Sequence, residues 1–419
     1  MEASQATSEP VLSSKPATKR SLLSSLMEVR EATAGATAAS TVPDSSASFK
    51  EDTYLLSTLS RSSEQKALRE LKQLLSASPT PISMWGVPLA PSAPGDDRAD
   101  VVLLKFVRAR DFDAGQAHDM LLRCAEWRRE FGADWVTEEE LVGFKELEGV
   151  VAYMHGWDRR GHPVCYNAYG VFKDKVVYER VMGDPEKLQR FLRWRIQVME
   201  RGVRLLQLRP GGVNSIIQVT DLKDMPKRQL RAASNHILSL FQDNYPEMVT
   251  RKVSARRAPF FASSLFFNHL HTRCSSTCRV ISVTTCVGCR FIRPEFVPVQ
   301  YGGLSRPGDL QNGPPKPATE FTIKGGERMS LEIDGIEVIL ISTSLLRLAV
   351  DHCTVIESDA GGYTVVVEKT RRIPATADVP IHHVFTAKEA GKMVLSVDNT
   401  NSRRRKVAAY RYVVCRSSS

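Results

Sequence analysis

The sequence has no run of roughly 18 uncharged apolar residues, the length that a membrane-spanning helix requires, although 42% of its 419 residues are hydrophobic. Its start, MEASQATSEP, carries an acid where a secretory signal has a basic region, and no apolar segment follows. Because there is no such signal, the eight cysteines predict reduced thiols and not a disulfide framework. We therefore expect a cytoplasmic or peripheral membrane protein.

The sequence also lacks the short motifs by which nucleotide-binding sites and common catalytic sites are recognised. It has no phosphate-cradling glycine loop of the Walker or Rossmann type. His155, Asp158 and His162 flank a turn, but no nucleophile with a paired base can be placed around them. We therefore expect neither an enzyme nor a cofactor.

Positively charged residues outnumber negatively charged ones. The formal net charge is +10 and the isoelectric point is about 9.2, which suits an anionic partner such as a membrane surface or a nucleic acid. The alternative is that mixed Arg and Glu residues on helix faces are simply solvated.

Aromatic residues are nearly absent from residues 1–62, which are rich in Ser, Ala and Thr. Such a segment buries too little surface to offset its ordering entropy, so we predict a disordered tail. Apolar spacing then predicts helices at 64–76, 100–109 and 114–130. Together these helices would form a small helical region over residues 63–135.

The stretch HILSLFQDNYPE at 236–247 predicts a helix end followed by a turn. Apolar residues recur at helical spacing after Pro226, and Pro246 prevents the helix from continuing. Tyr245 precedes that proline and is pushed toward an extended conformation, so the helix should end near Asp243, with a strand after the turn. Upstream, VNSIIQVTDLKD at 213–224 is typical of a buried strand.

This arrangement of strand, loop, helix and turn resembles the CRAL-TRIO lipid-transfer fold. Further matching blocks occur in the family's order: LLKFVRARDFDAGQAHDMLLRCAEWRREFG (103–132), WDRRGHPVCYNAYG (157–170), FLRWRIQVMERGVRLL (191–206) and VPVQYGGLS (297–305). With the ending TNSRRRKVAAYRYVV (400–414), the resemblance narrows to the plant patellins, which add a GOLD domain.

The resemblance implies an α/β CRAL-TRIO lipid-binding domain at 140–305 behind a helical cap, then an all-β GOLD sandwich at 315–416. It implies a phosphoinositide or other hydrophobic ligand, with a bound phospholipid in place of a cofactor. It also implies anionic membranes and trafficking proteins as partners, no nucleic acid, and roles in membrane trafficking and in cell-plate formation during cell division. The alternative function is a protein-interaction adaptor that acts through the GOLD domain without lipid cargo.

A sheet and its covering helices, both apolar on their inner faces, can open a pocket for acyl chains, and a few polar groups then hold the head group. The candidate head-group residues are Lys105, Arg108, Arg110, Thr220, Asp221 and Glu247. Arg110 matches the family's Arg-Ala-Arg motif, in which a lysine follows, whereas Asp111 follows here. Its alternative role is a surface ion pair, and that of Glu247 is a turn or cap acid.

Acidic residues are missing from 252–290, which contains five Arg and four Cys without helical or strand periodicity. The family has a strand, an apolar gating helix and a second strand in this interval, so the simplest interpretation is an out-of-frame segment. The alternatives are a zinc site, from Cys274, Cys278, Cys286 and Cys289 with His269 and His271, or a basic patch for nucleic acid or anionic lipid. We expect weak or absent lipid transfer if the gating helix is missing.

The C-terminal part predicts a β-sandwich. Short β-branched segments lie at 320–323, 329–334, 363–370, 382–386, 391–400 and 407–414. All five Trp lie before residue 195, whereas the family's sandwich usually contains Trp, and 336–360 lacks the expected pattern, so a second altered segment is predicted there. Four basic residues before the last strand, Arg403, Arg404, Arg405 and Lys406, could touch anionic head groups; the alternative is a solvated turn.

Overall fold

The computed structural model describes residues 62–78, 81–89, 97–221, 223–226, 228–254, 291–306, 308–310, 315–336, 339–345, 350–358, 364–373, 381–386 and 391–416. All of them belong to one compact unit, Pro43–Ser419. The predicted disordered tail lies outside these residues except at its last position. The zinc site and the basic patch, which were the two alternatives for 252–290, lie outside them as well, as does the irregular segment from residue 255 onward. Across the described residues, no helix is both long and apolar enough to cross a bilayer.

The N-terminal helical region is present as predicted. It contains α2 (Ser62–Ser76), α3 (Arg98–Ala109) and α4 (Ala114–Phe131), with a small hairpin of β1 (Ser83–Met84) and β2 (Val87–Pro88) between the first two helices. Asp113 caps α4, because its side chain accepts a hydrogen bond from the Gln116 amide. Gly132 ends the same helix in the left-handed conformation with φ of 70°.

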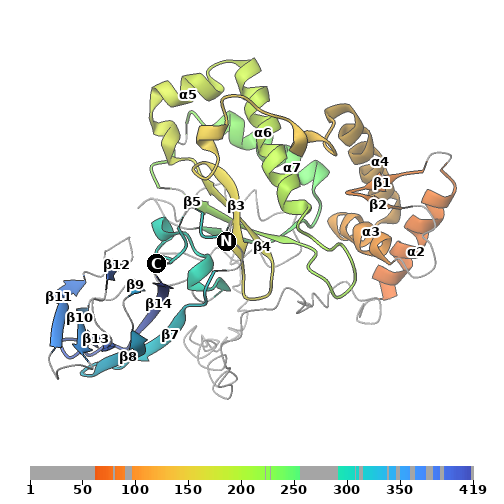
Figure 1. Cartoon of the computed structure of the whole chain (residues 1–419). Helices are drawn as coiled ribbons and strands as arrows, with labels where there is room; N and C mark the ends of the chain where they lie inside the picture. Colours follow the sequence, from red (N-terminus) through yellow and green to blue (C-terminus); the bar gives the residue numbers. More distant parts are fainter. Residues whose placement is uncertain are drawn as a thin grey trace, which may run out of the picture. The chain divides into compact units, whose positions relative to one another are not determined.

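The central region is a four-stranded sheet in the order β3-β4-β5-β6. Its strands are β3 (Ala152–Trp157), β4 (Pro163–Ala168), β5 (Ile216–Asp221) and β6 (Val249–Ser254), of which the last three are parallel and β3 is antiparallel to β4. Helices α5 (Lys175–Met182), α6 (Pro185–Val203) and α7 (Arg231–Asn244) lie over the sheet (Figure 1). Short 3-10 turns occupy Val136–Glu138, Lys145–Leu147, Gly170–Lys173, Pro294–Phe296 and Val299–Tyr301.

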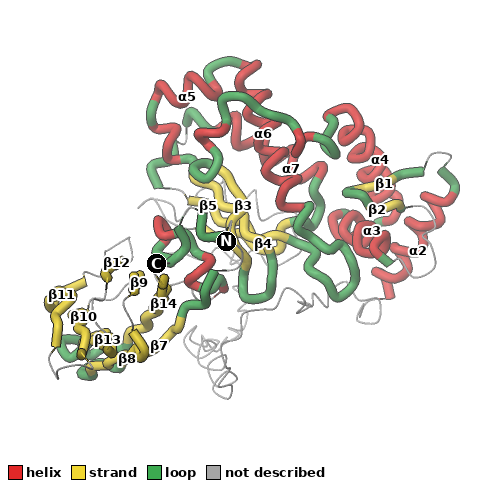
Figure 2. The backbone as a smooth tube through the Cα atoms, viewed as in Figure 1, coloured by secondary structure: helices red, strands yellow, loops and turns green. Residues whose placement is uncertain are grey.

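The two faces of the sheet are covered by different parts of the chain. Successive side chains of a strand point to opposite faces, and in β4 Cys165 packs into the core beneath the helices, whereas Tyr166 packs in a second cluster with Phe296 and Tyr301. Figure 2 shows the strands between the long helices and the short turns of residues 291–305. The cavity described below lies on the helical face.

The predicted helix end lies one residue from its expected position. Helix α7 ends at Asn244, Tyr245 and Pro246 form the turn, and β6 follows from Val249. The predicted strand at 213–224 is confirmed as β5. These local signals were readable because proline blocks a helix whatever the tertiary surroundings are.

The C-terminal region contains two antiparallel four-stranded sheets, ordered β11-β10-β13-β8 and β12-β9-β14-β7. The strands are β7 (Thr319–Ile323), β8 (Arg328–Ile336), β9 (Ile339–Leu345), β10 (Val350–Ser358), β11 (Thr364–Ile373), β12 (Ile381–Thr386), β13 (Gly391–Asp398) and β14 (Lys406–Arg416). Strands β9 and β10 lie within 336–360, where no strand was predicted, and that this segment is altered stays a prediction. This interval lacks Trp but has enough Ile, Val and Thr for two strands.

Candidate functional site

A cavity of about 200 Å³ lies between α7, the helical face of the sheet and the turn that follows α7. Its apolar wall comes largely from Ile237, Leu238 and Phe241 of α7, and polar groups of β4 and β5 face it. The lining consists of Ala109, Arg110, Asn167, Tyr169, Met199, Gln218, Thr220, Ser234, Ile237, Leu238, Phe241, Gln242, Asp243, Tyr245, Pro246, Glu247 and Val249. A partly open cavity with an apolar helix on one side and polar groups on the other suits an amphipathic ligand.

Three of the six predicted head-group residues line this cavity, namely Arg110, Thr220 and Glu247. They come from three separate parts of the chain: the end of α3, strand β5 and the turn after α7. Their contact with a head group stays a prediction. What the structure adds is that these three predicted side chains share one cavity.

Arg110 stands at the C-terminal end of α3, half-buried, and its Nη1 donates a hydrogen bond to the Ala109 carbonyl at 3.0 Å. Asp111 and Phe112 then have φ of 50° and 68°, in the left-handed region. The chain therefore turns sharply after Arg110, which lines the cavity.

Lys105 is fully buried and does not line the cavity. Its Nζ donates hydrogen bonds to the carbonyl oxygens of Asn214, at 2.6 Å, and Glu247, at 2.9 Å. A buried ammonium needs such acceptors, and here they fix the backbone of the turn in which Glu247 has φ of 52°. Whatever its relation to a ligand, Lys105 positions a cavity-lining residue.

Arg108 and Asp221 lie outside the cavity lining too. The Nε of Arg108 donates to Glu64 at 2.6 Å, joining α3 to α2. Asp221 is buried and accepts a hydrogen bond from the Lys223 amide at 3.0 Å, which shapes the loop after β5. The head-group role of both residues stays a prediction.

The turn after α7 is held by a buried network that sequence reasoning missed. The Tyr245 hydroxyl donates to Glu200 Oε1 at 2.6 Å, and Arg128 Nη1 donates to the same oxygen at 2.6 Å. Burial raises the pKa of Tyr245 well above its ordinary value, and the neighbouring Glu200 carboxylate adds to the rise. Burial alone would lower the pKa of Arg128, but Glu200 outweighs it, so this pKa is raised. The network joins α4, α6 and the cavity turn through charge-assisted hydrogen bonds.

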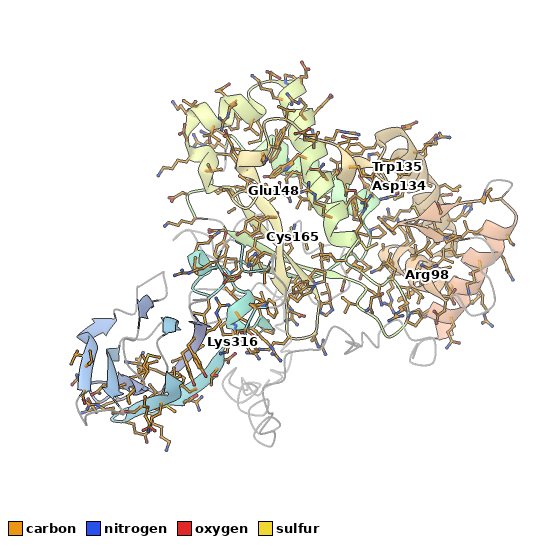
Figure 3. The ribbon with its side chains drawn as sticks, in the orientation of Figure 1. Arg98, Asp134, Trp135, Glu148, Cys165 and Lys316 are labelled. Atoms are coloured by element: carbon orange, nitrogen blue, oxygen red, sulfur yellow. The ribbon has the colours of Figure 1, made fainter. Side chains whose placement is uncertain are left out.

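A second buried pair missed by sequence reasoning includes one cavity-lining residue, Asn167. Arg195 of α6 donates from Nη2 to Asn167 Oδ1 of β4 at 2.7 Å, and both residues are buried. Figure 3 marks Cys165, two residues before Asn167, in the middle of the sheet. The sequence did offer one signal for this pair: Arg195 falls on the apolar face of the helical segment FLRWRIQVM. A charged side chain on a buried face needs a polar partner.

The predicted membrane-contact residues lie in the turn between β13 and β14. Arg403, Arg404 and Arg405 are exposed, and Lys406, the first residue of β14, is half-buried. Buried Asn399 fixes the turn, because its Nδ2 donates to the carbonyl oxygens of Lys324 and Arg404, each at 2.9 Å. Contact with a membrane stays a prediction for all four residues.

Three protein families match successive parts of the chain. The CRAL/TRIO N-terminal domain family matches residues 67–123, the CRAL/TRIO domain family matches 147–303, and the Patellin-1-like C-terminal GOLD domain family matches 324–406. The order agrees with the architecture predicted from the sequence. The exact domain boundaries of that prediction stay untested.

Several characterised proteins are similar over much of the chain. Patellin-6 of Arabidopsis thaliana is 55% identical over 384 residues, which cover 88% of this chain and 91% of that protein. Patellin-3 of the same plant is 37% identical over 402 residues, covering 90% and 79%. The phosphatidylinositol transfer protein SFH5 of Cryptococcus neoformans is 30% identical over 274 residues, covering 58% and 89%.

Proposed function

The chain belongs to the patellin family, and from this membership together with its cavity we propose that it binds a lipid between α7 and the sheet. The observation that carries the proposal is the lining itself, in which Ile237, Leu238 and Phe241 face the polar side chains of β4 and β5. A fungal relative is a phosphatidylinositol transfer protein, so phosphatidylinositol is the first candidate ligand and membrane-to-membrane transfer the first candidate activity.

The size of the cavity supports the proposal that α7 moves when a lipid enters. About 200 Å³ is less than the ~300 Å³ at which pockets for drug-sized ligands begin. Within α7 only Ala233 and Asn244 are fully buried, and its larger apolar residues are packed only in part. A helix packed in this way can be displaced at modest cost. We propose that α7 swings away from β5 to admit acyl chains.

Purified full-length protein should retain lipid after incubation with vesicles that contain phosphatidylinositol. Native mass spectrometry is expected to show one added lipid mass per protein. A protein that acts only as an adaptor through its GOLD domain would carry none, so an unliganded spectrum would reject the proposal in favour of the adaptor. Because the composition of 252–290 predicts weak or absent transfer, binding is measured separately from transfer between vesicles.

We propose that the turn Arg403–Arg405 contacts anionic membranes. We also propose that the protein acts in membrane trafficking and cell-plate formation, with trafficking proteins as partners of its GOLD domain. Three exposed cations near a charged surface contribute about 1 kcal/mol each. Charge reversal at all three positions should therefore reduce sedimentation with anionic vesicles at least tenfold. Reversing the exposed Arg69, Arg129 and Arg209 changes the net charge equally and serves as the control. Equal losses in both variants would refute a specific role for the turn.

A further inference from the structure

Arg195 is a buried cation beside the cavity. Its side chain comes from α6 and is 2% exposed, and its guanidinium carbon lies 6.0 Å from the ring centre of Phe241, a cavity-lining residue of α7. The guanidinium also lies 5.9 Å from the ring of Trp194. Aromatic faces attract a cation but do not replace an acceptor for each N–H group.

The charge of Arg195 has no acidic partner within the described residues. Its one hydrogen bond of normal geometry there, from Nη2, goes to the neutral amide oxygen of Asn167, and its Nε and Nη1 have no acceptor at hydrogen-bond distance. Arg128, buried to a similar degree, pairs with Glu200 at 2.6 Å and also with Asp134. A buried charge without a counter-charge is strongly destabilising, because no partner offsets its desolvation. Arg195 is therefore the buried arginine that a bound anion would stabilise.

The ionisable neighbours of Arg195 do not supply the missing negative charge. The Cys165 thiol and the Tyr169 phenol lie near enough to interact weakly with the guanidinium, but both are neutral partners. Burial raises the pKa of Cys165, and the nearby arginine opposes the rise without cancelling it. Burial likewise raises the pKa of the Tyr169 phenol, again against the arginine. Both groups are therefore protonated and neutral near pH 7.

Asn167 lines the cavity and has an amide donor that is not used within the described part of the protein. It is 1% exposed, its Oδ1 accepts from Arg195, and its Nδ2 has no partner although the residue lines the cavity. The bond from Arg195 fixes which amide atom is which, because the guanidinium can donate only to an oxygen. In the parallel register Asn167 lies opposite Thr220, also a lining residue. An amide N–H polarised by a cation behind it is a suitable donor to an anion.

We propose that Asn167 and Arg195 form a phosphate subsite at the wall of the cavity, where Asn167 contacts the phosphate and Arg195 supplies the charge behind it. This rests on the proposed lipid-binding function and assigns a ligand class to the same site: lipids that carry a phosphate group. Phosphate fits better than carboxylate because it offers more acceptor oxygens, which the side chains of Gln218 and Thr220, both lining residues, can use.

The test compares full-length wild type with Arg195→Met and Asn167→Asp. Each protein is incubated with vesicles that contain phosphatidylinositol and diacylglycerol of the same acyl chains, and bound lipid is quantified by native mass spectrometry. Wild type should prefer the phosphate-bearing lipid at least tenfold, as expected when a charge-assisted hydrogen bond is at stake. Both variants should lose that preference and still carry diacylglycerol. Arg201→Met, which removes an exposed arginine of the same helix paired with Glu148, should keep it.

Thermal unfolding gives a second readout that does not depend on lipid. Inorganic phosphate should raise the unfolding midpoint of wild type and of Arg201→Met but not that of the two test variants. Asn167→Asp supplies an internal carboxylate for Arg195, so this variant should unfold at a higher temperature than wild type without ligand. If Arg195→Met fails to fold, Asn167→Asp still tests the phosphate subsite, because this variant keeps the arginine.

The outcomes separate this inference from the proposed function. If wild type binds both lipids equally, or if both variants keep the preference, the phosphate subsite is wrong while lipid binding stands. If wild type binds no lipid but phosphate stabilises it and not the variants, lipid binding is wrong and the subsite takes free phosphate. If neither lipid nor phosphate distinguishes wild type from the variants, the subsite is wrong.

Discussion

Replacing Ser234 with Trp is expected to reduce lipid binding at least tenfold while leaving the protein folded. Ser234 lies on α7, lines the cavity and is only half-buried. An indole ring at this position would occupy much of a space of about 200 Å³ and add apolar contacts that hold α7 against the sheet. The ligand would then have to displace both the ring and the helix. Retention of phosphatidylinositol, measured by native mass spectrometry, checks the loss.

The matched control for this variant is Ala232→Trp. Ala232 is exposed on the same helix, so the substitution adds the same side chain outside the cavity. We expect lipid binding close to that of wild type. Equal binding by Ser234→Trp and wild type would mean that the ligand does not use this cavity, and the proposed site would have to be abandoned.

Features of the chain that depend on local chemistry could be predicted from the sequence. The end of α7 follows from Pro246, and the start of α4 follows from Asp113, since each acts on backbone groups within a few residues. The apolar spacing of the N-terminal helices predicted their bounds to within two residues. Strands β9 and β10 were missed because the absence of Trp was given more weight than the β-branched content of 336–360.

The cavity wall could be predicted only in part, because the residues that contact one another there are far apart in the sequence. Family motifs pointed to Arg110 and Glu247, and the end of the predicted strand pointed to Thr220; these three residues share the cavity. The bond between Arg195 and Asn167 spans 28 positions and that between Tyr245 and Glu200 spans 45. Neither separation corresponds to the periodicity of a helix or a strand, so a sequence pattern cannot reveal it. A buried charge indicates that a partner exists, but the sheet register and the packing of α6 decide which residue it is.

Arg128→Met is expected to lower the free energy of unfolding by about 3–5 kcal/mol, because it leaves the buried Glu200 without its cation. Arg128 and Glu200 are 3% exposed each, and the arginine also lies 5.2 Å from the Trp85 ring. All five Trp lie before residue 195, so tryptophan fluorescence during denaturation reports on the cap and lipid-binding domain and not on the sandwich. The midpoint of that transition is the measurement.

Two further variants separate lost charge pairing from lost packing. Arg128→Met combined with Glu200→Gln removes both charges while keeping an acceptor for the Tyr245 hydroxyl, so it should recover at least half of the loss. Arg129→Met, at an exposed neighbouring position, should change the stability by less than about 0.5 kcal/mol. If the double variant is no more stable than Arg128→Met, the arginine acts through packing against Trp85, and the ion pair does not hold the turn after α7. Since that turn carries Glu247, recovery of stability without recovery of lipid binding would show that the network's charge orders the cavity as well as the fold.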